Sequence, residues 1–150
     1  MAPNYLLIYS ERLATDIELL CQNIKAPSNT VFQIRKSSSS VYANIREANY
    51  GQSKADMLSK FEISLKECSE TEGWLKILFN TGIIDEETFK KHRNLCGRIR
   101  RMLISSCKTL KESISKYMGL NYERQSCIIY KSFCSYFSLF YFLQCFRAYH

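Results

Sequence analysis

The sequence is short of residues that interrupt helices: it has five glycines and two prolines, Pro3 and Pro27, among 150 residues. An all-β chain of this length needs many turns, and turns depend on glycine and proline. The scarcity therefore argues against an all-β fold and favours long helices. Hydrophobic residues make up 46 % of the chain and charged residues 23 %, values that also exclude an intrinsically disordered protein.

The sequence also lacks the cysteine and histidine patterns of metal proteins. Its seven cysteines form no CxxC pair, and neither His92 nor His150 stands at zinc-ligand spacing from them. An odd number of scattered cysteines indicates a reducing compartment. The N-terminal apolar run, Tyr5 to Tyr9, follows no basic residue and is too short for a secretory signal. We therefore predict a cytoplasmic protein with no metal and no cofactor.

Catalytic patterns are scarce as well. His92 stands four residues before Cys96, a spacing that places a base beside a thiol on one side of a helix. Both residues, however, fall on the predicted core face, where a histidine is usually structural and a cysteine behaves as a small apolar residue. The acidic residues Glu67, Glu70 and Glu72 are not matched by the Glu-x-x-His motif of a di-metal bundle. We predict that the chain is not an enzyme.

Four helices are predicted from apolar residues spaced alternately by three and four. The first runs from Leu6 to Ile24 and stops at Pro27, after which Ser, Asn and Thr are candidate N-caps. The same spacing continues through four consecutive serines to Ala48, so residues 33–48 are interpreted as helix, with a low-complexity linker as the alternative. Gly51 can end this helix. The other two helices follow Ser53, a candidate cap with Asp56 three residues later, and Gly82, a helix stop.

The third predicted helix is apolar on two sides. Its core seam is predicted to contain Leu58, Phe61, Leu65, Cys68, Glu72, Leu75 and Phe79. A carboxylate on a buried seam needs a partner, and Arg35 or Asn44 is the hypothesis for Glu72. An exterior helix of a monomer has no use for a second apolar side. We therefore predict an oligomer interface formed by Ile63, Trp74, Ile77 and Leu78.

The formal net charge of +7 is concentrated in the fourth predicted helix. Its apolar arc contains Phe89, His92, Cys96, Ile99, Leu103, Leu110 and Ile114. Its other face is continuous and basic, and Glu112 is the one acidic residue between Lys90 and Lys116. Such a face suits a polyanion, although a solvated surface without function is the alternative. The candidate nucleic-acid-binding residues are Lys90, Arg93, Arg98, Arg100, Arg101, Lys108, Lys111 and Lys116.

Short connections between four helices predict an all-α, antiparallel up-down four-helix bundle over residues 1–116. Residues 117–150 form an aromatic and cysteine-rich C-terminal extension of different composition. Three alternatives stay open for it: a membrane span, a fifth helix packed on the bundle or the oligomer, and a disordered or aberrant extension. Lys131 and several polar residues make the membrane span the poorest of the three.

Two stretches of the sequence resemble a known family. "QIRKSSSSVYANIREA" is similar to the second helix of the bacterial four helix bundle proteins, which include proteins encoded in intervening sequences of large-subunit ribosomal RNA genes. "QSKADMLSKFEISLKECSETEGWLKIL" is similar to the third helix of one branch. The resemblance is strong over residues 33–84, weaker over the outer helices and absent after about residue 117. Ala48 and Gly73 depart from the family pattern. The matching residues with predicted structural roles are Ser40, Asn44, Ile45, Glu47, Glu70 and Glu72.

The resemblance implies a homopentamer and, in one branch, an accessory protein of diversity-generating retroelements that binds nucleic acid and a reverse transcriptase. With the basic face, it predicts a non-enzymatic homopentameric scaffold for RNA, DNA or a nucleic-acid enzyme such as a reverse transcriptase. The alternative is a purely structural or protein-partner oligomer without nucleic-acid binding. No base-reading motif is present, so we expect any binding to follow charge or shape.

Overall fold

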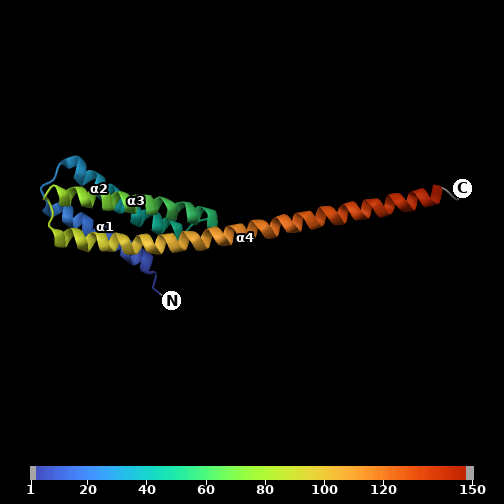
Figure 1. The fold of residues 1–150 in the computed structure, drawn as a ribbon, viewed down its shortest axis with the longest axis horizontal. Coiled ribbons are helices and arrows are strands. Elements are labelled where there is room, and N and C mark those ends of the chain that lie inside the picture. The colour runs from blue at the N-terminus through green and yellow to red at the C-terminus, as the bar shows by residue number, and fades with distance from the viewer. Residues whose placement is uncertain (1–2, 148–150) are drawn as a thin grey trace. The chain divides into compact units, whose positions relative to one another are not determined.

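The structure, a computed structural model, describes the backbone of residues 3–147 and side-chain packing over residues 3–117. Its regular elements over the described backbone are four helices, with no strand (Figure 1). They are α1 (Tyr5–Asn23), α2 (Ser28–Ala48), α3 (Lys54–Asn80) and α4 (Glu86–Arg147). This result confirms the predicted all-α class, and it shows that the serine run is helix and not a linker.

Local hydrogen bonds explain where α3 and α4 begin. The Ser53 hydroxyl accepts a hydrogen bond from the Asp56 backbone N–H at 3.1 Å, and Asp56 Oδ2 accepts one from the Gln52 N–H at 3.2 Å. This reciprocal arrangement is the predicted cap of α3. Asp85 Oδ1 accepts from the Thr88 N–H at 2.7 Å and so caps α4. Gly82, with φ of 70°, supplies the left-handed residue that ends α3, as predicted.

The ends of α2 differ in detail from the prediction. Its N-cap is Pro27, with no side-chain cap hydrogen bond, and Ser28, Asn29 and Thr30 lie inside the first turn. The fixed φ of proline suits the start of a helix, so the polar residues after it are not needed as caps. At the other end α2 stops at Ala48, and Gly51 lies beyond it in the turn that leads to α3.

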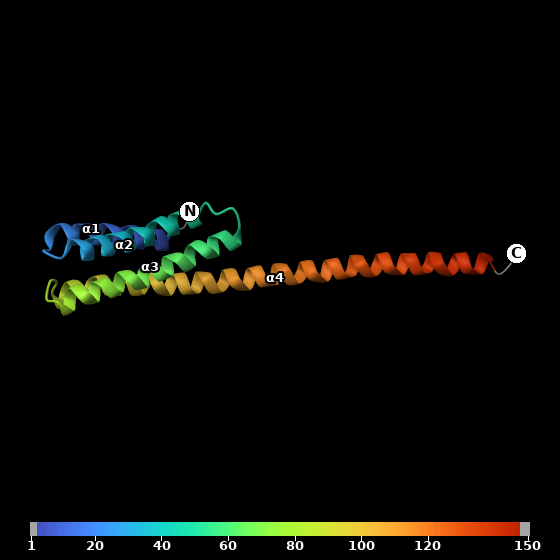
Figure 2. The ribbon, with the colours of Figure 1, turned by 90° about the horizontal axis from the view of Figure 1, so that it is seen from above.

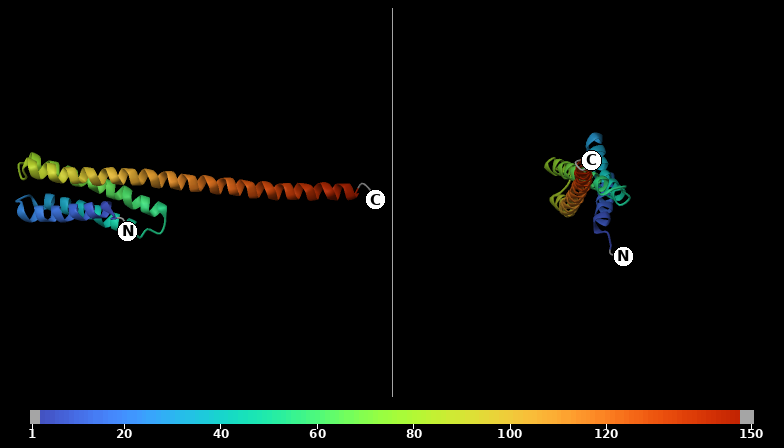
Figure 3. Two further views of the ribbon diagram at one scale, coloured as in Figure 1. Left: turned by 90° about the horizontal axis from the view of Figure 1, so that it is seen from below. Right: turned by 90° about the vertical axis from the view of Figure 1, so that its right-hand side faces the viewer.

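The four helices pack antiparallel around a shared core, as predicted. Figures 1 and 2 show α1 beside α2 and α3 beside α4, and the end-on view in Figure 3 shows all four around one centre. Ion pairs join neighbouring helices in antiparallel register: Glu18 with Arg35, Glu47 with Lys60, Glu72 with Arg100, and Glu62 with Lys111. A further ion pair, between Asp16 of α1 and Lys91 of α4, joins the first helix to the last.

The chain divides into two compact units, Met1–Lys111 and Glu112–His150. The first holds the bundle. In the second, the backbone through Arg147 continues α4 as helix. The side chains of residues 118–150 lie outside those described, so the boundary at 116 stays a prediction and the three alternatives for the tail stay untested. Over the residues that the structure describes, no helix combines the length and apolarity needed to span a bilayer.

The core face of α3 differs from the predicted seam. Its buried residues are Phe61, Ser64, Cys68, Thr71, Leu75 and Leu78. The predicted members Leu65, Glu72 and Phe79 are each one residue away from a buried position and are only half-buried. The helix is therefore rotated so that two small hydroxyl side chains face inward. Leu65 and Phe79 still pack against the core as half-buried side chains. The prediction is wrong in giving them the buried positions that Ser64 and Leu78 occupy, because it followed hydrophobicity alone.

The small inward residues allow α2 and α3 to approach closely. Ser37 and Ser38 are buried in the serine run of α2, and their hydroxyls bond to main-chain carbonyls one turn earlier. From α3, the Ser64 hydroxyl lies 3.4 Å from the Val41 carbonyl oxygen of α2. A side chain that reaches the backbone of the neighbouring helix shows that the serine run is a packing surface inside the bundle.

Candidate nucleic-acid interface on helix α4

The predicted core and basic faces of α4 are separated in the structure. His92, Leu95, Cys96, Ile99, Leu103 and Cys107 are buried, with Phe89, Leu110 and Ile114 half-buried beside them. Arg100 is half-buried, and the other seven predicted cations are exposed. The predicted apolar arc is therefore correct apart from Leu95 and Cys107, which it missed. The basic residues occupy the opposite face, where a large anion has access to them.

Four of the eight cations form ion pairs with carboxylates. Lys90 pairs with Glu86 at 2.8 Å, and Lys111 pairs with Glu62 at 2.8 Å. Lys111 donates this hydrogen bond to the Glu62 carboxylate, which raises the pKa of the lysine. Arg93 and Arg100 share the carboxylate of Glu72. These four side chains are tied to the surface of the bundle.

The partners of Glu72 correct the sequence hypothesis. Arg93 Nε lies 3.2 Å from Glu72 Oε1, and Arg100 Nη1 lies 2.6 Å from Glu72 Oε2. Glu72 thus bridges α3 to α4, and the hypothesis of Arg35 or Asn44 on α2 is wrong. Arg35 instead pairs with Glu18 at 3.0 Å, while Asn44 donates to the Ser40 carbonyl at 2.9 Å. The rotation of α3 explains the error, because it turns Glu72 toward α4.

The remaining four cations are Arg98, Arg101, Lys108 and Lys116. Within residues 3–117, none of them forms an ion pair with a carboxylate. Their positions along the helix place Arg98, Arg101 and Lys108 close to the centre of the solvent-facing side. A cation with no intramolecular partner is attracted to an external anion without first breaking an ion pair.

A polar hollow of about 410 Å³ lies on this face, between α3 and α4. Gly97 contributes to its lining with no side chain, and arginines surround it. We refer to it as the Gly97 hollow; its lining residues are Glu72, Arg93, Asn94, Gly97, Arg98, Arg100 and Arg101. The charge pattern of the sequence predicted the arginines as binding residues. It did not indicate the hollow, because Gly97 and Asn94 are uncharged and do not contribute to that pattern.

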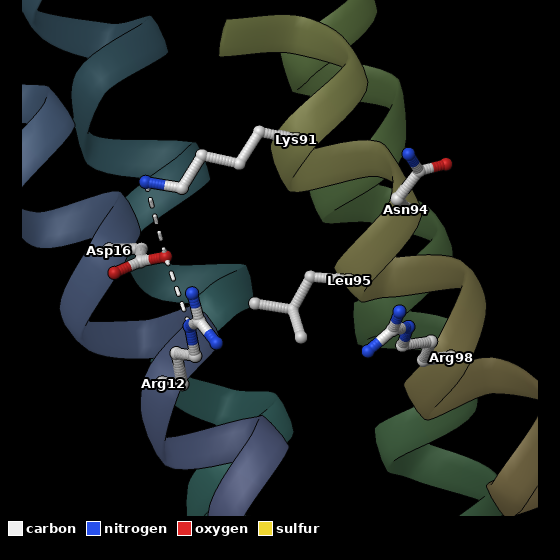
Figure 4. A pocket seen from close by; sticks show the side chains of 6 residues that line it. All are labelled: Arg12, Asp16, Lys91, Asn94, Leu95 and Arg98. Atoms are coloured by element: carbon white, nitrogen blue, oxygen red, sulfur yellow. Dashed lines mark ion pairs between the residues drawn. The ribbon is translucent and has the colours of Figure 1, made fainter.

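A second hollow of about 130 Å³ lies between α1 and α4 (Figure 4). Lys91 extends from α4 toward Asp16 of α1, and Asp16 Oδ2 lies 3.8 Å from both Lys91 Nζ and Arg12 Nε. Leu95 points into the space between the two helices. Arg98 and Asn94 line this hollow and the Gly97 hollow as well. Cations therefore extend across α4 from one side to the other, and sequence analysis missed the contribution of Arg12.

The residues considered for catalysis are buried. His92 is 4 % exposed, and its Nδ1 is hydrogen-bonded at 2.7 Å to the Thr88 carbonyl of its own helix. Cys96 is fully buried, and its carbonyl accepts a hydrogen bond from Cys68 Sγ at 3.4 Å. Neither side chain is presented to a substrate. Among the residues that the structure describes, no group of three or more His, Cys, Asp or Glu side chains could hold a metal ion.

The predicted oligomer surface on α3 is retained only in part. Ile63 and Ile77 are 37 % and 46 % exposed, and Trp74 is half-buried with its Nε1 donating to Glu70 at 3.2 Å. Leu78 is 0 % exposed and belongs to the bundle core, so its assignment to an oligomer interface is wrong. The rotation that turns Glu72 outward also turns Leu78 inward.

The family-motif residues have structural contacts. Ile45 is buried in the core, and Glu47 pairs with Lys60 of α3. The carbonyl of Ser40 accepts the hydrogen bond from Asn44. Glu70 and Glu72 hold Trp74 and the two arginines described above.

Comparison with known proteins agrees with this architecture. The family model of the 23S rRNA-intervening sequence protein matches residues 8–105. The chain is 37 % identical to a solved protein of unknown function from the S23 ribosomal protein family of Bacteroides thetaiotaomicron, with a TM-score of 0.67. The match covers 69 % of this chain and 98 % of that chain. None of the curated proteins matches.

Proposed function

The chain belongs to the 23S rRNA-intervening sequence protein family, and from that premise we propose that it is a non-enzymatic, oligomeric helical-bundle protein that binds nucleic acid through α4. The proposed partner is the phosphate backbone of RNA or DNA, which the protein would recognise by charge. A reverse transcriptase bound to such a nucleic acid is a further candidate partner. The proposal places the protein in the cytoplasm, where such partners occur.

The observation that carries the proposal is the set of unpaired cations on one exposed face. Arg98, Arg101 and Lys108 lie on the solvent side of α4 with no carboxylate partner among the described residues. Each phosphate that such a cation neutralises releases condensed counterions, and this release supplies most of the affinity in sequence-independent binding. Oligomerisation would repeat the face in every copy and strengthen binding by avidity.

The experiment is fluorescence anisotropy with a labelled single-stranded RNA, titrated at several salt concentrations. The test variant replaces Arg98, Arg101 and Lys108 by serine; Arg100 is kept because its pair with Glu72 stabilises the bundle. The control replaces Lys25, Lys66 and Lys76, three exposed lysines outside α4, so that both variants lose the same charge. We expect the test variant to bind much more weakly than the control and to show a slope of log K against log salt reduced by about 2.

The alternative function is an oligomer that serves structure or protein binding and uses its charge for solubility. The exposed Ile63 and Ile77 on α3 support self-association in either case. Size-exclusion chromatography with light scattering and absorbance at 260 and 280 nm separates the two functions. A pentameric mass that carries nucleic acid at low salt supports the proposal; a pentamer free of nucleic acid, with equal anisotropy for both triple variants, supports the alternative. A monomer contradicts the oligomeric part of the proposal.

A further inference from the structure

Gly97 stands at a position of α4 where the fold does not require glycine. Among the described residues only Gly82 has a positive φ, so the backbone at Gly97 suits any residue. A Cβ built there meets only Arg101 Nη1, at 3.5 Å, which is ordinary van der Waals contact. Glycine destabilises a helix interior relative to alanine. Neither backbone conformation nor packing compensates for that loss, and the effect of the glycine is to leave the Gly97 hollow open.

The hollow is surrounded by guanidinium groups held in position. Glu72 binds Arg93 through Nε and Arg100 through Nη1, so each guanidinium keeps further N–H groups. Arg93 also lies over the ring of Phe89 at 5.9 Å, and that ring stacks on Phe79 at 4.8 Å. Two arginines are therefore fixed by contacts with the bundle before any ligand arrives, which lowers the entropy cost of binding.

The other two arginines are available to a ligand. Arg98 and Arg101 have no carboxylate partner in the part of the chain with described side chains, and the Nη1 of Arg101 lies near Gly97. Four arginines thus line the hollow against one carboxylate, whose two oxygens are both occupied by arginines. Guanidinium groups match the geometry of phosphate oxygens and bind them through paired hydrogen bonds.

We propose that the Gly97 hollow binds one phosphate group of a nucleic-acid backbone and thereby fixes the position of the strand on α4. This inference rests on the proposed function and adds a defined site to it. Arg98 and Arg101 contact the phosphate, whereas Glu72 acts as a positioning residue for Arg93 and Arg100. The rest of the basic face, including Lys108, then contributes charge without a defined geometry.

The test is to fill the hollow without changing its charge. Gly97→Leu adds a side chain at the centre of the arginines and improves helix propensity. Gly73→Leu is the matched control, because Gly73 is an exposed glycine in the interior of α3 with no atom within 4 Å of its Cβ. Circular dichroism on both full-length variants establishes that they fold. Gly97→Glu, with Gly73→Glu as its control, is the second pair and serves if the leucine variant does not fold.

We expect Gly97→Leu to bind single-stranded RNA about tenfold more weakly than the wild type, with a salt slope lower by about 0.7 for the lost phosphate. Gly73→Leu keeps the wild-type values. If Gly97→Leu also keeps them while the Arg98, Arg101 and Lys108 triple variant loses binding, the hollow is not a site and the proposed function stands.

If the wild type binds neither single-stranded RNA nor single-stranded DNA, the proposed function fails, and the hollow is then tested with inorganic pyrophosphate by calorimetry. Binding to the wild type and to Gly73→Leu, but not to Gly97→Leu, supports a phosphate site at the hollow. Equal binding to all three proteins, or no binding to any, overturns the site.

Discussion

The Thr71 hydroxyl of α3 donates a hydrogen bond of 2.9 Å to the Ser37 hydroxyl of α2, and both residues are buried in the bundle core. Ser37 belongs to the serine run, and its hydroxyl reaches the Ile34 carbonyl at 3.3 Å. Because small hydroxyl side chains satisfy one another here, two helices pack closely without leaving an unpaired polar group. The serine run is therefore part of the core.

Enlarging this contact should destabilise the bundle. Ser37→Leu forces a larger side chain into a position that is 1 % exposed, and overpacking of this kind costs about 1 to 3 kcal/mol. Ser39→Leu, two residues away on the exposed side of α2, is the control and should change the free energy of unfolding little. Urea denaturation followed by circular dichroism measures both. Equal stability of the two variants would show that Ser37 does not lie in the core.

The Glu72 bridge between α3 and α4 should contribute to stability. Its side chain is 20 % exposed and serves two arginines, so Glu72→Gln should cost about 1 kcal/mol, with less loss at high salt. Glu62→Gln breaks a single ion pair, the one with Lys111. The Glu62 and Lys111 side chains are 45 % and 59 % exposed, so this substitution should cost less. Thermal melting at low and high salt makes the comparison. A larger loss for Glu62→Gln would contradict the bridge.

Much of the fold follows from apolar spacing, but the rotation of α3 does not. The helices, the Ser53 cap and the basic face of α4 could all be predicted, because each depends on residues near one another in sequence. The choice between Leu65 and Ser64 as the inward residue depends on another helix, where the Val41 carbonyl lies within reach of the Ser64 hydroxyl. A contact between side chains of two helices, such as the hydrogen bond from Thr71 to Ser37, cannot be predicted from a single sequence.

The candidate site shows the same limit. Charge counting found the arginines of α4, whereas their division into paired and unpaired sets depends on where Glu72 points. The packing of α3 sets that orientation, and the apolar pattern predicted a buried face of α3 that is shifted by one residue from the observed one. The Gly97 hollow was not predictable, since it arises from the absence of a side chain among long ones.

Replacing either of two glycines by alanine should change the free energy of unfolding, but in opposite directions. Gly82 has φ of 70°, a conformation that a Cβ disfavours, so Gly82→Ala should lower the free energy of unfolding by about 1 to 2 kcal/mol. Gly73 lies within α3 with open space around it, so Gly73→Ala should raise that free energy by up to about 1 kcal/mol. Urea denaturation distinguishes them, and shifts of the same sign would show that one backbone assignment is wrong.

The buried thiol of Cys96 should make stability fall at alkaline pH. The hydrogen bond with Cys68, together with burial, raises the pKa of Cys96 above the value of about 8.5 found in an unfolded chain. Above that pH the unfolded chain releases a proton that the folded protein keeps, so deprotonation favours unfolding. The stabilising contribution is complete below about pH 8.5 and is lost as the pH rises toward the folded pKa.

The measurement is the free energy of unfolding between about pH 8 and pH 10 for the wild type and a double variant, Cys68→Ala with Cys96→Ala, because the two thiols are coupled. The variant removes both titrating thiols, so its curve should fall less steeply, by up to about 1.4 kcal/mol per pH unit.

Alkylation with mass spectrometry gives a second readout: Cys68 and Cys96 are 1 % and 0 % exposed, so both should stay unmodified in the folded protein and react in guanidinium. Identical slopes for the two proteins, or labelling of Cys96 under native conditions, would contradict a buried neutral thiol between α3 and α4.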